Sequence, residues 1–421
     1  MVTALCADSG TVQKAGTIYR EHWLRRGISK MLRYRLSLWP AAVAVLAVQP
    51  LLADTVQVGG CKPNLANYPT ISAAVASVPS GSTIDVCPGT YAEQVTITKS
   101  LNLTGVASGT ANQAVITVPS GGLVSNAVSM FGESVAAQIG VVSTVPVTVN
   151  ITNLAVDGTG GDMGCLSWLA GIFYGSMSSG TVNRVRASGQ VDTTCGVGIW
   201  VENSDTSNQA VNVRNSSVYN VDSAGIFAGS GTTPTLSVSL NNNVVSASSA
   251  VADIDVDSVH GTVSNGNISN ASFGVFDSSS GVSVTANTVI GSTTGIYLAN
   301  GGTASNNQVS GGSEGILLGA SGATINDNTI VSNTTAGVEL GCFAASLGNN
   351  TINDAPVGLD SVPASASLGT NNFFNTTTTI TGGCAAAAIA SPRAMGMRSN
   401  VSSNVREQWH TPATPFGTRT K

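Results

Sequence analysis

Glycines at a nearly constant interval most constrain what this chain can fold into. From residue 265 onward, a unit of Asn-x-[Val/Ile], about six residues and Gly-[Ile/Val/Leu]-x recurs, with glycines at positions 274, 295, 315, 337 and 358. The steps are 21, 20, 22 and 21 residues. Upstream, the same frame fits Gly171-Ile172, Gly198-Ile199, Gly225-Ile226 and, with aspartate in the glycine slot, Asp253-Ile254. A period of this length indicates one supersecondary unit that stacks on its neighbours.

The residues within each unit select the type of solenoid. Leucine-rich repeats share the period but need several leucines per unit, whereas these units have short β-branched runs separated by Gly, Asn and Ser. We therefore expect an all-β fold, a right-handed parallel β-helix, in which each coil adds about 4.8 Å to two or three long parallel sheets. Asparagines at a recurring position predict a buried ladder of hydrogen-bonded amides, with these members: Asn183, Asn243, Asn287, Asn307, Asn328, Asn350 and Asn372.

The N-terminal part carries a second signal. In "YPTISAAVASVPSGSTIDVCPGTYAEQVTITKSLNLTG", a short helix with Ile71, Ala74, Val75 and Val78 on one face precedes three strands. This segment resembles the start of pectin-lyase-like right-handed β-helix proteins, which include pectin methylesterases and periplasmic NosD-type proteins. The resemblance spans about residues 55–384 and implies that the helix is the N-terminal cap. The motif sets of polygalacturonases and pectin methylesterases are absent, so the resemblance implies the fold and not their mechanism.

The first residues read as a leader. From Met31, the expected true start, Arg33 and Arg35 precede an apolar stretch and the small residue Ala53, the pattern of a secretory signal peptide. A single membrane anchor is the alternative, but prolines interrupt the run, which is short for a span of about 20 residues. We expect residues 1–53 to be a leader, 54–384 the β-helix and 385–421 a flexible C-terminal tail without repeats, with the mature chain secreted, periplasmic or at the cell surface and without a membrane span.

Charge limits the class of partner. After residue 53 the chain has ten Lys/Arg and twenty Asp/Glu, a net charge near −10. Between Ser100 and Ala390 the basic side chains are Arg184, Arg186 and Arg214. Nucleic acid and anionic membrane surfaces both need a basic footprint, so we exclude them as partners.

Six cysteines remain after the leader. An even number in an exported chain predicts disulfides, although sequence alone does not fix their connectivity. Two of the six lie in long loops of neighbouring coils, and the others lie near the cap and in the last coils. We therefore expect neighbours in sequence to pair: Cys61–Cys87, Cys165–Cys195 and Cys342–Cys384.

The variable residue of each Gly-Ile-x-Leu strand should point outward, because side chains alternate along a strand. Along the coils these outward positions are Phe173, Trp200, Phe227, Asp255, Phe276, Tyr297, Leu317, Glu339 and Asp360. A row of outward aromatic rings could stack on sugar rings as a substrate-binding platform. Alternatively, a loop or a second subunit covers the row as ordinary buried packing. Residues 157–170 and 186–197 are the candidate covers.

One member of this row, Asp255, lies between two further acids on the same strand. Asp253, Asp255 and Asp257 lie on one strand, about 6.5–7 Å apart, and small neighbours in adjacent coils suggest that they are accessible. They could be the acid and base of a glycoside hydrolase, or Asp253 and Asp255 could share Ca²⁺, as in lyases that act on acidic polysaccharides. Glu202 could extend the cluster. A solvated acidic strand is the alternative.

Two functions remain open. One is an exported polysaccharide lyase or glycoside hydrolase that binds a polysaccharide or cell-surface glycan along the aromatic row, with Arg214 contacting a uronate carboxylate. The other is a non-catalytic, NosD-like periplasmic or cell-surface protein. Apart from Ca²⁺, the sequence implies no cofactor. The enzyme hypothesis largely fails if residues 157–170 or 186–197 cover the rings.

Overall fold

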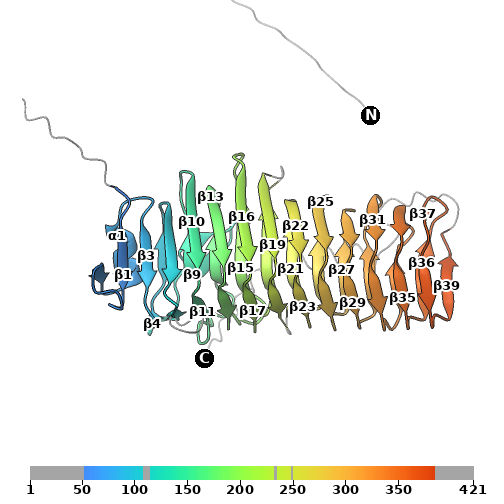
Figure 1. Ribbon diagram of the computed structural model, residues 1–421, viewed down its shortest axis with the longest axis horizontal. Coiled ribbons are helices and arrows are strands. Elements are labelled where there is room, and N and C mark those ends of the chain that lie inside the picture. The colour runs from blue at the N-terminus through green and yellow to red at the C-terminus, as the bar shows by residue number, and fades with distance from the viewer. Residues whose placement is uncertain (1–51, 108–113, 232–234, 248–249, 385–421) are drawn as a thin grey trace, which may run out of the picture. The chain divides into compact units, whose positions relative to one another are not determined.

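The computed structural model describes residues 52–107, 114–231, 235–247 and 250–384. In this part the chain winds as a right-handed parallel β-helix, and each coil contributes one strand to each of three long sheets (Figure 1). The all-β fold class expected from the repeat is confirmed.

Sheet A has 14 strands, which in spatial order are β2 (Ala66–Tyr68), β1 (Thr55–Val58), β3 (Thr83–Val86), β6 (Leu101–Gly105), β10 (Val147–Thr152), β13 (Ser178–Asn183), β16 (Gln209–Arg214), β19 (Leu236–Asn241), β22 (His260–Ser264), β25 (Gly281–Thr285), β28 (Thr303–Ser305), β31 (Ala323–Asn326), β34 (Ala345–Gly348) and β37 (Ser367–Leu368).

Sheet B has 12 strands, which are β4 (Gly89–Ala92), β7 (Ala114–Thr117), β11 (Ala155–Asp157), β14 (Arg186–Ser188), β17 (Ser217–Tyr219), β20 (Val244–Ser246), β23 (Asn267–Ser269), β26 (Thr288–Ile290), β29 (Gln308–Ser310), β32 (Thr329–Val331), β35 (Thr351–Asn353) and β38 (Asn372–Phe374).

Sheet C has 13 strands. Twelve are parallel, namely β5 (Val95–Ile97), β9 (Ser134–Val141), β12 (Trp168–Tyr174), β15 (Gly196–Asn203), β18 (Ala224–Ser230), β21 (Ala252–Asp257), β24 (Phe273–Asp277), β27 (Thr294–Leu298), β30 (Glu314–Leu318), β33 (Ala336–Glu339), β36 (Val357–Val362) and β39 (Thr378–Gly382). The last, β8 (Ala127–Val128), pairs antiparallel with β9 as a hairpin.

The register of sheet C follows the repeat frame. Ile172, Ile199, Ile226 and Ile254 stack on one another in successive coils, and all four side chains are buried in the continuous core. The glycine before each of the first three isoleucines lies where sheet B bends into sheet C, and Asp253 occupies the same position before Ile254. At Gly225, a Cβ atom would come 2.3 Å from Val245 Cγ1, so the bend leaves no room for a side chain there.

The asparagine ladder exists from Asn287 to Asn371, and three of the expected members lie outside it. One of them, Asn243, bonds the Ser216 amide and the Val213 carbonyl oxygen instead of another asparagine. Asn287 Nδ2 donates to Asn307 Oδ1 (3.1 Å), and the same contact continues through Asn328 and Asn350. At the end of the ladder Asn350 donates to Asn371, not to Asn372. Asn183 is also outside the ladder, because it lies at the end of β13 and accepts a bond from Asn215.

A short helix closes the N-terminal end. Helix α1 (Ile71–Ser77) begins after Thr70, whose hydroxyl accepts a hydrogen bond from the Ala73 amide. Glu93 accepts bonds from the Ile71 and Ser72 amides (2.8 Å each), which satisfies backbone donors of the first helical turn. None of the helices that the structure describes is long and apolar enough to span a membrane.

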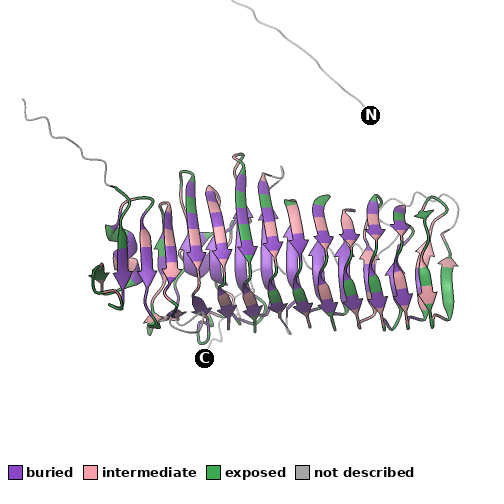
Figure 2. Cartoon of the chain, in the orientation of Figure 1, coloured by how far each residue is buried: buried purple, intermediate pink, exposed green. Residues whose placement is uncertain are grey.

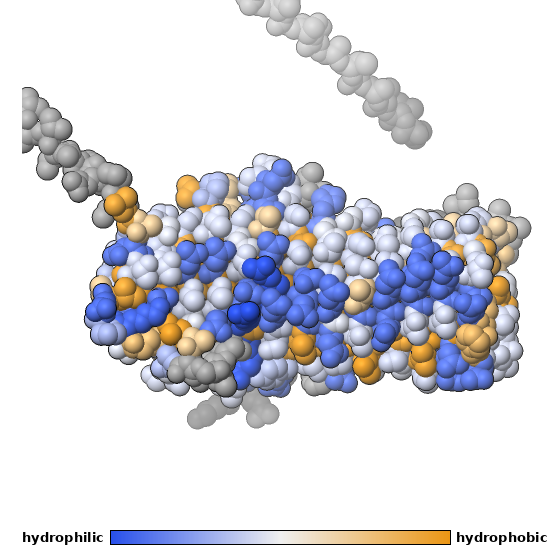
Figure 3. Space-filling view, viewed as in Figure 1, coloured by the Kyte–Doolittle hydropathy of each residue, from blue (hydrophilic) through white to orange (hydrophobic). Residues whose placement is uncertain are grey.

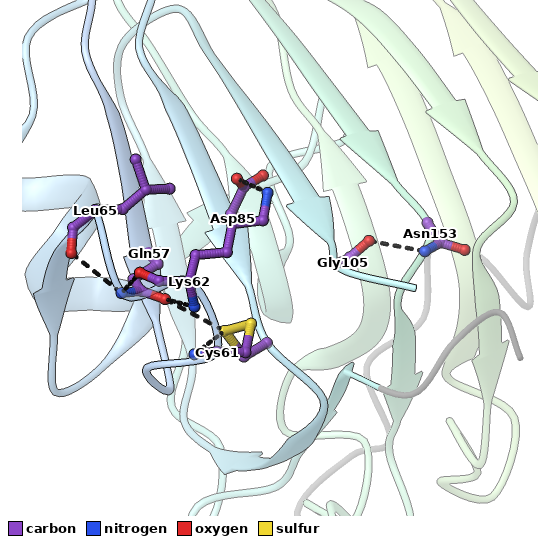
Figure 4. A network of polar contacts seen from close by, with 8 residues as sticks. Gln57, Cys61, Lys62, Leu65, Asp85, Gly105 and Asn153 are labelled. Atoms are coloured by element: carbon purple, nitrogen blue, oxygen red, sulfur yellow. Dashed lines mark hydrogen bonds and ion pairs between the residues drawn. A yellow bond between two sulfur atoms is a disulfide. The ribbon is translucent and has the colours of Figure 1, made fainter. Parts of the chain in front are cut away.

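The three expected disulfides are present: Cys61–Cys87, Cys165–Cys195 and Cys342–Cys384. The first joins the loop after β1 to the end of β3, beside the contacts that Gln57 Nε2 makes with the carbonyl oxygens of Lys62 and Leu65 (Figure 4). Lys62 forms an ion pair with Asp85 of β3 in the same network. The expected leader and C-terminal tail lie outside the described residues, except for positions 52 and 53.

Candidate functional site

The outward aromatic row of sheet C, which we call the aromatic row, does form, but its rings are buried. The exposed fractions are 1% for Phe173, 0% for Trp200, 2% for Phe227, 3% for Phe276 and 5% for Tyr297. Neighbouring rings meet edge to face, with centroids 5.7 Å apart for Phe173–Trp200 and 5.2 Å for Phe276–Tyr297. The aromatic row is therefore a second apolar layer outside the sheet, and the exposed platform expected by the enzyme hypothesis is absent.

Part of the cover comes from a segment that the repeat frame does not include. The turn between β8 and β9 packs Met130 and Phe131 against the aromatic row, and the Phe131 ring lies 6.3 Å from that of Phe227. Trp168, inside the range 157–170 expected to act as a cover, meets Trp200 edge-on at 5.7 Å. The covered alternative is thus the one observed for these rings.

Glu202 stabilises this cover through two hydrogen bonds. Its Oε1 accepts a hydrogen bond from the Met130 amide (2.7 Å), and its Oε2 accepts one from the Trp200 indole (2.9 Å). Burial raises the pKa of Glu202 to about 8, because a desolvated carboxylate is disfavoured. Glu202, expected to extend an accessible acidic cluster, instead lies beneath the hairpin.

Asp253 points into the bend between sheets B and C. Its Oδ1 accepts a hydrogen bond from the Ala247 amide (2.7 Å), and its Oδ2 accepts one from the Ala271 amide (3.3 Å). The residue is 0% exposed, and burial raises the pKa of its carboxyl to about 8. The side chain therefore bonds the turns of two successive coils, and the expectation that it is accessible is wrong.

The other two acids of β21 point outward. Asp255 lies between Phe227 and Phe276 in the aromatic row and is 3% exposed, so it is not accessible either. Asp257 is half-buried, and its Oδ1 accepts bonds from the Ser258 and Ser278 hydroxyls (3.0 and 2.8 Å). The catalytic roles of these acids, and the calcium role of Asp253 with Asp255, stay predictions. No group of three or more His, Cys, Asp or Glu side chains in the described ranges is arranged to hold a metal.

Asp277, which the sequence did not single out, is a further buried acid near this strand. It is 0% exposed, its Oδ1 accepts a bond from the Ser279 amide (2.8 Å), and its Oδ2 is buried without a hydrogen-bond partner. Burial raises the pKa of Asp277 to about 8, and the nearby Asp257 raises it further in the same direction. Asp277 pairs in register with Val256 and Leu298, positions that the repeat frame assigns to apolar residues.

The outward side of sheet A carries a long uncharged row, which we call the polar row. Its members occupy equivalent positions in successive strands and are half-buried or exposed: Asn102, Asn150, Thr181, Asn212, Ser239, Thr262, Ser283, Thr303, Thr324 and Ser346. Asn150 Nδ2 donates to Asn102 Oδ1 (2.9 Å), so part of the row is ordered by its own bonds. The signal was visible in the sequence as alternating Ser, Thr and Asn between apolar residues.

A shallow cavity adjoins the polar row. It has a volume of about 390 Å³, and its lining includes Ser179, Gln209, Ser237 and His260. Arg214, expected to bind substrate, is exposed at the end of β16 on the same sheet. In Figure 2, strands that alternate between buried and more exposed residues lie in front of the wholly buried strands of sheet C. The corresponding surface in Figure 3 is mostly hydrophilic or intermediate in hydropathy.

Comparisons with known proteins agree with this architecture. Residues 197–374 match the family model described as a right handed beta helix region. A search of curated proteins gave no significant match. Among solved structures, the chain is similar to the A-module of the Azotobacter vinelandii mannuronan C-5 epimerase AlgE6, with 17% identity, 75% of this chain and 95% of that chain covered, and a TM-score of 0.42.

Two further solved structures show the same level of likeness. The lacto-N-biosidase from Eubacterium ramulus has 9% identity, 76% and 68% coverage of the two chains, and a TM-score of 0.47. An alginate lyase in complex with a trisaccharide has 12% identity, 78% and 86% coverage, and a TM-score of 0.44. The family-model match and the three parallel sheets establish that the chain has the right-handed parallel β-helix fold that its repeat predicts.

Proposed function

We propose that this chain is an exported, non-catalytic β-helix protein that binds an uncharged, hydroxyl-rich polysaccharide along the outward side of sheet A. The observation that carries the proposal is the polar row, which repeats uncharged hydroxyl and amide side chains from strand to strand beside the shallow cavity. A polysaccharide repeats its own hydroxyl groups along a chain, so a repeating surface can bind it at many equivalent positions.

The chemistry of the polar row fits such a ligand. Hydroxyl and amide groups both donate and accept hydrogen bonds, as sugar hydroxyls do. Neighbouring strands place these groups about 4.7–4.9 Å apart along the sheet. Bonds that members of the polar row make within the sheet, Asn150 Nδ2 to Asn102 Oδ1 (2.9 Å) and Asn102 Nδ2 to Thr83 Oγ1 (3.3 Å), hold side chains in place before binding. Such preorganisation lowers the entropic cost of association.

Export is supported by the cysteines. Disulfides form and persist in oxidising compartments and are rare in the cytosol. All six cysteines of the described residues are paired. This agrees with a secreted, periplasmic or cell-surface protein, for which the sequence of residues 31–53 supplies the expected signal peptide.

We do not expect the protein to cleave its ligand, because the acids predicted to perform cleavage are not accessible together. Asp253 and Asp255 are 0% and 3% exposed, and Asp253 already accepts two backbone hydrogen bonds. A pair of catalytic carboxyl groups must reach both the glycosidic oxygen and a water molecule or the anomeric carbon. The half-buried Asp257 alone does not meet this requirement.

The test is a binding assay on the purified mature chain with a panel of neutral and acidic polysaccharides, using affinity electrophoresis. Asn212→Glu places a charge in the middle of the polar row, and we expect it to weaken binding about tenfold, a change of about 1.4 kcal/mol. Asn267→Glu is the matched control, because Asn267 is another exposed asparagine, at the start of β23 in sheet B.

Three results would contradict the proposal. Binding of no neutral polysaccharide would remove its basis. Equal losses in the two variants would mean that sheet A is not the binding face. Release of reducing ends or unsaturated products, with or without calcium, would show that the protein is an enzyme, and loss of that turnover in Asp255→Asn would restore the catalytic role predicted from the sequence.

A further inference from the structure

Three aspartates follow sheet B strands of successive coils in the loops that lead to sheet C. Asp162 follows β11, Asp192 follows β14 and Asp222 follows β17. The first two lie in the long loops that Cys165 and Cys195 join by a disulfide. These loops lie outside the polar row and outside the three acids of β21.

Asp222 and Asp192 each accept hydrogen bonds from backbone amides of the preceding coil. Asp222 Oδ2 accepts a bond from the Asp192 amide (2.6 Å), and its Oδ1 accepts one from the Gly196 amide (2.7 Å). Asp192 Oδ2 accepts bonds from the amides of Met163 and Cys165 (3.0 Å each). Both oxygens of Asp222 therefore have donors, whereas only one oxygen of Asp192 does.

The second carboxyl oxygen of Asp192, Oδ1, lacks a hydrogen-bond donor. Asp192 is 1% exposed, and its Oδ1 is buried without a hydrogen-bond partner. The carboxyl group in hydrogen-bonding contact with Asp192 is that of Asp162, a solvent-exposed residue. Two carboxyl groups in contact repel each other unless a proton or a cation lies between them.

We propose that Ca²⁺ binds between the carboxylates of Asp162 and Asp192 and ties the loop of residues 158–167 to that of residues 189–195. Carboxylate oxygens are the ligands that this hard cation prefers, and backbone carbonyl and water oxygens fill its other positions in a flexible geometry. Mg²⁺ demands a nearly ideal octahedron and gives up water reluctantly, so it fits a site in surface loops less well. Zn²⁺ is disfavoured because the cysteines nearby form a disulfide.

A cation at this site connects to the cover of the aromatic row through the loop that contains Asp162. The loop that contains Asp162 leads directly into β12, whose first residue, Trp168, packs on Trp200. Asp192 also holds the Met163 and Cys165 amides of this loop. Bound Ca²⁺ therefore stabilises the segment that covers the aromatic row.

The experiment uses the purified, oxidised mature chain after treatment with EDTA. We expect Ca²⁺ to bind with a dissociation constant of about 10⁻⁴–10⁻³ M, the range of extracellular calcium modules. Titration calorimetry gives the stoichiometry, and thermal unfolding with and without about 10 mM CaCl₂ gives the shift in Tm, with MgCl₂ at the same concentration as the ionic-strength control.

Asp162→Asn is the decisive variant, because its side chain is exposed and its substitution does not disturb the core. In EDTA we expect it to melt at or above the wild-type temperature, because the contact between two carboxylates is relieved. In CaCl₂ the wild type should gain in Tm and the variant should not. Asp54→Asn is the matched control, since Asp54 is another exposed aspartate whose Oδ1 accepts one backbone amide.

A wild-type chain that binds no Ca²⁺, or an Asp162→Asn variant that binds it as the wild type does, would overturn the proposal. An equal Tm gain in MgCl₂ would mean that the effect is ionic strength and would also overturn it. None of these readouts involves polysaccharide, so failure here is distinct from failure of the proposed function.

Discussion

Replacing Asp253 by asparagine tests whether a buried acid in the glycine slot makes folding depend on pH. Burial raises the pKa of Asp253 to about 8, whereas an aspartate in an unfolded chain titrates near about 3.9. Between these values the folded state keeps the proton and the unfolded state releases it. The contribution of Asp253 to stability is therefore complete below about pH 4 and is lost as the pH rises toward about 8.

The magnitude follows from proton linkage. One proton held only by the folded state changes the free energy of unfolding by about 1.4 kcal/mol per pH unit, so the wild type should lose about 2.7 kcal/mol from this residue between pH 5 and pH 7. Asparagine has nearly the same shape as the neutral acid and keeps an oxygen for the Ala247 amide, but it does not titrate. Asp277 and Glu202, whose pKa values are also raised to about 8, are unchanged in the variant and cancel in the comparison.

The assay is urea unfolding of both proteins at pH 5, 6 and 7, followed by circular dichroism. We expect the stability of the wild type relative to Asp253→Asn to fall by about 2–3 kcal/mol across this range. Asp327→Asn, at an exposed turn position after β31, is the control for a change of net charge. Parallel pH profiles for wild type and Asp253→Asn would refute the reasoning, because they would mean that the carboxyl is already ionised in the folded protein.

Two further substitutions test the internal supports of the solenoid. Asn328→Ala should lower the free energy of unfolding by about 2–4 kcal/mol, because it leaves the buried Ala304 carbonyl and Asn307 amide without their partner. Urea unfolding measures this loss, with Gln308→Ala at an exposed position as the control. A loss in Asn328→Ala no larger than that in the control would contradict the prediction. Glu202→Gln places an amide group where the Met130 amide and the Trp200 indole both donate, so one donor loses its acceptor at a cost of about 1–3 kcal/mol. Limited proteolysis should then cut faster near residue 130 than in the wild type, and unchanged cleavage there would mean that Glu202 does not hold the hairpin.

The positions of residues within each coil could be predicted from the sequence, because they depend on local periodicity. The glycine slot, the inward isoleucines and the outward row all occupy the positions that the spacing indicates. The asparagine ladder shows the limit of the same reasoning. Asn183 and Asn372 match the local Asn-x-[Val/Ile] pattern or come close to it, yet Val185 and Asn371 occupy the equivalent positions before their sheet B strands. Registry with the next coil, which a single unit does not contain, decides which asparagine is buried.

The candidate site was harder to predict because accessibility depends on distant parts of the chain. The sequence places Trp200 and Phe227 outward, but Met130 and Phe131, from a hairpin some seventy to one hundred residues earlier, pack on this layer. The burial of Asp253 has a different cause. The sequence places Asp253 outward between the glycines of adjacent coils, whereas the glycine slot lies at a bend where its side chain turns inward toward backbone amides.

The burial of sheet C also decides where a large partner can bind. Its outward residues pack as a second core, so the rings offer little surface to a ligand. Removing the cover would expose a large apolar area to water, and the free energy of binding a polar ligand would not offset that cost. Sheet A differs because the residues of its polar row are uncharged and half-buried or exposed, so a ligand with hydroxyl groups displaces only water from them. Binding on sheet A therefore leaves both the covered row and the proposed calcium site intact, and an Asn212→Glu variant should bind polysaccharide about tenfold more weakly while keeping the wild-type response to Ca²⁺.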